Sequence, residues 1–82
     1  MIHANDKYNP RIQDAEGIIP DDEPVFLIRG QDPAAADAVR AYIKLAEASG
    51  AEDALVVGCQ NHIKLIEQWH VEHADEIHPA DL

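Results

Sequence analysis

The chain has 82 residues and a formal charge of −10, from sixteen acidic and six basic side chains. Hydrophobic residues make up 46% of it, but thirteen of them are alanine. The material for a core is therefore thin, and a domain of this size buries only about 60% of its unfolded surface. The negative charge is spread over both halves of the sequence, which argues against binding to nucleic acid or anionic membranes and favours basic protein surfaces as partners.

The cysteine content and the N-terminal segment indicate the compartment. Cys59 is the one cysteine in the sequence, so no internal disulfide can form, and this is typical of a reducing environment. The first residues lack the basic start and apolar stretch of a signal peptide, and no apolar run approaches the roughly 18 residues that a membrane span needs. We expect a cytoplasmic protein that binds neither membrane nor nucleic acid.

Residues 1–20 show no sustained hydrophobic period and contain Pro10, Gly17 and Pro20. We interpret them as a flexible N-terminal arm, and residues 21–82 as a single small domain. The run Val25-Phe26-Leu27-Ile28 predicts one short strand, closed by Arg29-Gly30. A lone strand needs a partner, which is the arm, a segment packed as extended chain, or the same strand of a second copy.

Two helices are expected in the rest of the chain. Asp32 and Pro33 predict a helix start, an apolar stripe follows at helical spacing, and Ser49-Gly50 predicts the helix end. The stripe consists of Ala35, Val39, Tyr42, Ile43 and Ala46. A second helical period runs from about Glu52 to about Ala74. The short connection predicts an antiparallel helical hairpin, preceded by an extended arm and one short strand. We expect this mainly α fold to be completed by homodimerisation.

Cysteine and histidine recur on one arc of the second helix, as Cys59, His62, His70 and His73. Thiolate and neutral imidazole are ligands that zinc prefers. Cys59 and His70 are separated by about 16 Å along a helix, so only an antiparallel pair of second helices would bring all four residues together. A zinc-stabilised dimer is one hypothesis; the other is that these residues are ordinary hydrogen-bonded members of a packing face, with no cofactor.

The densest acidic cluster is Asp21-Asp22-Glu23, followed by Asp32 and Asp37. Such carboxylates suit binding to a basic protein surface, although a solvated turn before Pro24 gives the same pattern. Trp69, the sole tryptophan, is a candidate interface anchor, and a core role explains it equally well. No nucleotide-binding, redox or zinc-protease motif occurs, so we expect a binding protein and not an enzyme.

The stretch from Asp21 to Asp32, the alanine-rich helix from Val39 to Ala51 and Trp69 near the end of the second helix resemble small uncharacterised acidic proteins of bacterial phages and prophages. The resemblance covers about residues 19–82. It implies a viral accessory protein that binds and modulates or inhibits a host protein or complex, including defence complexes, but it assigns no site residue. A small structural or assembly protein of the virion is the alternative.

Overall fold

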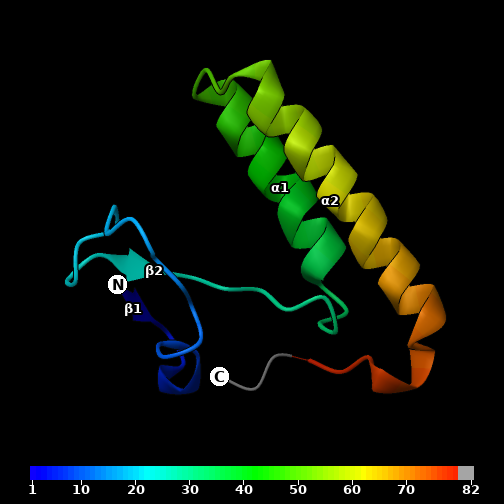
Figure 1. Ribbon diagram of the computed structural model, residues 1–82. Coiled ribbons are helices and arrows are strands. Elements are labelled where there is room, and N and C mark those ends of the chain that lie inside the picture. Colours follow the sequence, from blue (N-terminus) through cyan, green and yellow to red (C-terminus); the bar gives the residue numbers. More distant parts are fainter. Residues whose placement is uncertain (80–82) are drawn as a thin grey trace. The chain divides into compact units, whose positions relative to one another are not determined.

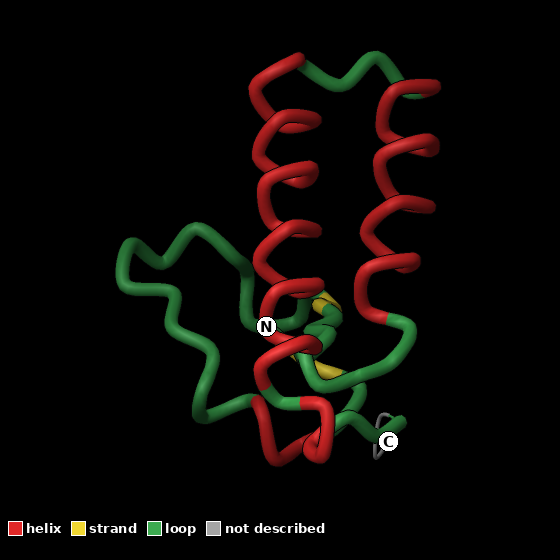
Figure 2. The backbone as a smooth tube through the Cα atoms, turned by 90° about the vertical axis from the view of Figure 1, so that its right-hand side faces the viewer, coloured by secondary structure: helices red, strands yellow, loops and turns green. Residues whose placement is uncertain are grey.

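The computed structural model describes residues 1–79 and is mainly helical. Helices α1 (Ala35–Ala48) and α2 (Asp53–Glu72) lie side by side and run in opposite directions (Figures 1 and 2). The chain divides into two compact units, residues 1–28 and the hairpin unit that begins at Arg29. The predicted hairpin is thus present, whereas the sequence placed a boundary at residue 20 and the structural division follows Ile28.

The turn between the helices has the geometry that its glycine predicts. Gly50 has a φ of 84°, its amide donates to the Glu47 carbonyl, and the Ala51 amide donates to the Ala46 carbonyl. These two bonds form a Schellman motif, which satisfies the last carbonyls of α1 and reverses the chain. Residues 49–52 therefore suffice to join two antiparallel helices.

Helix α1 begins two residues later than the sequence predicts. Asp32 does not cap the helix, whose N-cap is Ala34 with no side-chain cap; its Oδ1 instead accepts the Ala34 amide at 2.8 Å, within a turn that precedes the helix. The Ala38 amide then donates to the Ala34 carbonyl at 2.8 Å. The carboxylate thus stabilises a turn that leads into the helix.

The hairpin core is small and consists of aliphatic side chains from both helices. Its five buried members are Ala35, Ala36, Ile43, Ile63 and Ile66, with Val39, Val56 and Cys59 packed against them. Tyr42, which the sequence places on the same stripe, is half exposed. The alanines let the helices approach closely. Gly58 takes no part in that contact, because no atom of α1 lies within 4 Å of the position that a Cβ would occupy there.

The unit of residues 1–28 contains two short parallel strands, β1 (Ile2–His3) and β2 (Pro24–Val25). Ile2 is in register with Pro24 and His3 with Val25, and the Ile2 amide donates to the Glu23 carbonyl at 3.0 Å. A 3-10 helix, η1 (Asp6–Tyr8), follows β1. The strand predicted at residues 25–28 is therefore displaced to Pro24–Val25, and its partner is the N-terminal segment.

A second 3-10 helix, η2 (Ala74–Glu76), follows α2. Helix α2 ends at Glu72, close to the predicted end, because His73 leaves the helical conformation with a ψ of 43°. The His78 amide donates to the Gln31 carbonyl at 3.0 Å, so the segment after α2 contacts the segment that precedes α1. None of the described helices is long and apolar enough to cross a membrane.

Candidate functional site

The predicted acidic cluster lies in an exposed turn that leads into β2. Asp21, Asp22 and Glu23 are all exposed, and among residues 1–79 their carboxylates form no hydrogen bond or ion pair. Their backbone is fixed, since the Glu23 amide donates to the Pro20 carbonyl and the Glu23 carbonyl accepts from Ile2. Three carboxylates thus project from an anchored turn, without a partner among the residues that the structure describes.

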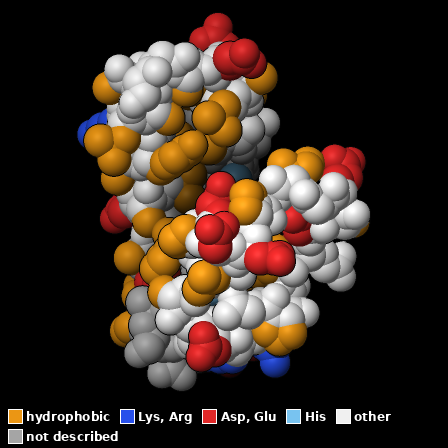
Figure 3. All heavy atoms as spheres, turned by 90° about the vertical axis from the view of Figure 1, so that its left-hand side faces the viewer, with side chains coloured by type: hydrophobic (Ala, Val, Ile, Leu, Met, Phe, Trp, Pro, Cys, Tyr) orange, Lys and Arg blue, Asp and Glu red, His pale blue; other side chains and the backbone are white. Residues whose placement is uncertain are grey.

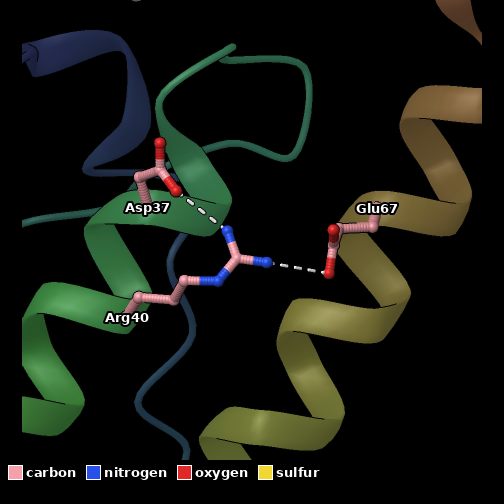
Figure 4. A network of polar contacts seen from close by, with 3 residues as sticks. All are labelled: Asp37, Arg40 and Glu67. Atoms are coloured by element: carbon pink, nitrogen blue, oxygen red, sulfur yellow. Dashed lines mark hydrogen bonds and ion pairs between the residues drawn. The ribbon is translucent and has the colours of Figure 1, made fainter.

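The other two predicted acidic residues belong to the hairpin unit and have internal partners. Asp32 accepts the Ala34 amide, and Asp37 binds the Arg40 guanidinium at 2.8 Å. Arg40 also reaches across to Glu67 on α2 at 3.0 Å, so that one arginine bridges two carboxylates (Figure 4). The hydrogen bond that Arg40 donates to Asp37, with the nearby charge of Glu67, raises the pKa of Arg40. The guanidinium links α1 to α2 through an exposed ion pair on this side.

The structure gives each of the predicted metal ligands on the second helix a separate environment. Cys59 packs against the hairpin core, and His62 is exposed. His70 bonds through Nε2 to the Gly30 carbonyl, and His73 bonds through Nδ1 to the Trp69 carbonyl at 3.0 Å. Within the described part of one chain, no group of three or more histidine, cysteine or acidic residues is placed to hold a metal ion.

Trp69 is half-buried near the C-terminal end of α2. Its indole stacks on the His73 ring, with centroids 4.2 Å apart and planes 13° from parallel. It also lines a hollow of about 360 Å³ in the hairpin unit, together with Arg29, Gly30, Gln31, His62, Leu65 and Ile66. The His70–Gly30 bond holds one wall of this hollow against α2. Trp69 thus forms part of the wall of this hollow and is partly exposed.

His3 is the residue of greatest structural consequence that the sequence reasoning missed. Its side chain is 2% exposed, and both ring nitrogens are engaged: Nδ1 accepts the Asn5 amide at 2.9 Å, and Nε2 donates to the Leu27 carbonyl at 3.2 Å. The ring also contacts Tyr8 edge-on and stacks on Phe26. A histidine next to the start of an apparently irregular arm carries no sequence signal for this role, because its partners lie up to 24 residues away.

No protein-family model, curated protein or solved structure matches this chain. The candidate sites therefore rest on the geometry described above.

Proposed function

We propose that this chain is a non-catalytic accessory protein of a phage or prophage, which binds a host protein or complex in the bacterial cytoplasm and modulates or inhibits it. The viral origin rests on the sequence resemblance. The binding role is supported by one observation above all, the three exposed and unpaired carboxylates of Asp21, Asp22 and Glu23 on an anchored turn.

Unpaired carboxylates on a fixed backbone suit a basic partner for two reasons. No internal ion pair has to be broken before they contact lysine or arginine, and their positions are set before the encounter. The net charge of −10 adds long-range attraction, which speeds association with a positive surface and weakens as salt screens it. Asp32 and Asp37 contribute mainly to this field, since each already has an internal partner.

The non-catalytic part of the proposal follows from the cysteine and histidine environments. Cys59 is the strongest nucleophile in the sequence, yet it packs against the aliphatic core. His70 and His73 use ring nitrogens to bond backbone carbonyls within the hairpin. A reactive thiolate needs an electropositive and open setting with a base in contact. The residues around Cys59 favour packing over thiol chemistry.

The proposal is tested by affinity capture from bacterial lysate at low and high salt, with the triple variant Asp21→Lys, Asp22→Lys and Glu23→Lys. The matched control is Glu72→Lys, Asp75→Lys and Glu76→Lys, which changes the net charge equally at the end of α2. We expect the wild-type chain and the control to retain one specific protein at low salt and the first variant to lose it. Equal capture by both variants would contradict a role for this turn.

A further inference from the structure

The helical hairpin has two broad faces that differ in charge. Helices α1 and α2 carry eight charged side chains between them, and seven lie on one side. This charged face consists of Asp37, Arg40, Lys44 and Glu47 on α1 with Asp53, Lys64 and Glu67 on α2. The eighth, Glu72 in the last turn of α2, lies about 140° around the helix from Glu67, at the border of the opposite side, which otherwise carries no charged residue of either helix. This uncharged face consists of Tyr42, Leu45, Leu55, His62, Leu65 and Trp69.

The Arg40–Glu67 ion pair shows which sides of the two helices belong to the same face (Figure 4). At about 100° per residue, Tyr42 lies about 160° around α1 from Arg40, and His62 lies about 140° around α2 from Glu67. Tyr42 and His62 therefore both point away from the ion pair. The hollow beside Trp69 confirms the α2 assignment, because His62, Leu65 and Trp69 line it together.

The uncharged face exposes several large apolar side chains. Leu45 is 70% exposed and Leu65 is 65% exposed, with Tyr42 and Leu55 near half. Two of the five buried core residues are alanines. Figure 3 shows hydrophobic side chains gathered over one side of the hairpin and acidic ones at its tip. A core this small gives little stability by itself, so a partner on the uncharged face would supply what the hairpin lacks.

We propose that the uncharged face binds a second copy of this chain, so that two hairpins form a four-helix bundle. Two chains of charge −10 repel each other unless their contact excludes most of the acidic groups, and on this face α1 and α2 present only Glu72, at its border. Helices of 14 and 20 residues are about 21 Å and 30 Å long and about 10 Å wide, which gives about 500 Å² of face per copy. Two copies then bury about 1,000 Å², which is about the smallest area expected of a biological interface.

Packing selects the relative direction of the two hairpins. Charge does not, because exposed carboxylates lie at the tip, on Glu47, Glu52 and Asp53, and also at the base, on Glu72, Asp75 and Glu76. With the tip of one copy over the base of the other, Leu55 of one copy lies near the hollow that Arg29 and Trp69 line on the other. The bundle is therefore antiparallel, with a two-fold axis across the helices.

Sedimentation equilibrium of the full chain tests the interface through two matched double variants. Tyr42→Glu with Leu65→Glu adds two charges to the uncharged face, and Val57→Glu with Val71→Glu adds two on the other side of α2, where both valines are also exposed. We expect the wild-type chain to be a dimer and the Val57/Val71 control to dimerise with similar affinity. In the Tyr42/Leu65 variant, the dissociation constant of the dimer should rise about 100-fold or more. Circular dichroism verifies that each variant is helical. A monomeric wild-type chain, or equal loss in both variants, would overturn the proposal.

Two further measurements test the same interface. Fluorescence of Trp69, the sole tryptophan, is expected to shift to shorter wavelength over the concentration range in which the dimer forms, because the indole lies on the face that becomes covered. A spin label on Ala48→Cys in a Cys59→Ala background reports the direction of the hairpins. Labels about 30 Å apart or more support the antiparallel bundle. Labels that lie side by side would refute the antiparallel arrangement. An unchanged Trp69 emission would refute the interface on the uncharged face.

Discussion

The substitution His3→Phe probes the contact that holds residues 1–28 together. Phenylalanine keeps an aromatic ring against Tyr8 and Phe26 but leaves two backbone groups without their partner, the Asn5 amide and the Leu27 carbonyl. Because the site is buried, each unpaired group costs about 1–3 kcal/mol, and part of that cost is relieved by water entering the loosened unit. We therefore expect a loss of about 2 kcal/mol in the local stability of this unit.

Hydrogen exchange followed by mass spectrometry measures that loss directly. A change of about 2 kcal/mol corresponds to roughly 30-fold faster exchange for amides that open with the unit, such as Ile2, whose amide donates to the Glu23 carbonyl. Amides of α1 and α2 should keep their rates, since the hairpin has its own core. The control is His78→Phe, at an exposed ring. Unchanged exchange in residues 1–28 of the His3→Phe protein would refute this account of the unit.

Two further predictions concern the hairpin and are measured by chemical denaturation at a fixed protein concentration. Ile63→Ala should lower the free energy of unfolding by about 2–4 kcal/mol, because Ile63 is buried between the helices, whereas a loss below about 1 kcal/mol would mean that this core is not closely packed. Gly50→Ala should destabilise by about 1–2 kcal/mol, because alanine is strained at a φ of 84°. Gly58→Ala should instead raise the free energy of unfolding by about 0.5–1 kcal/mol, since its site is helical and open. If both glycine substitutions changed the free energy of unfolding in the same direction, the backbone conformations assigned here would be contradicted.

Local chemistry in the sequence predicts the helical part of this protein well. Apolar residues at helical spacing predict α1 and α2, and Gly50 predicts the turn, because helix periodicity and left-handed glycine depend on neighbours a few residues away. The start of α1 is less well predicted. The sequence predicts Asp32 as the helix cap, but only the tertiary structure shows that its carboxylate bonds within the turn that precedes the helix.

The candidate site depends on contacts that no local pattern encodes. The sequence identifies Asp21, Asp22 and Glu23 as acidic. The fold determines that their carboxylates have no partner within residues 1–79, whereas Asp37 is bound to Arg40. Likewise, helical spacing groups Cys59 with three histidines, but the structure directs His70 to the Gly30 carbonyl, 40 residues away in sequence. Such partners are chosen by which segments meet in space.

The sequence by itself determined the charge, the two helices and their antiparallel connection, because each follows from composition or from interactions within one or two turns of chain. Only the tertiary structure decided that the N-terminal segment pairs with Pro24–Val25, that His3 is buried, and that seven of the eight charged residues of the two helices share one face. These features depend on long-range contacts and on the rotation of each helix about its axis. Both are fixed by packing, since a side chain's neighbours across an interface are not its neighbours in sequence.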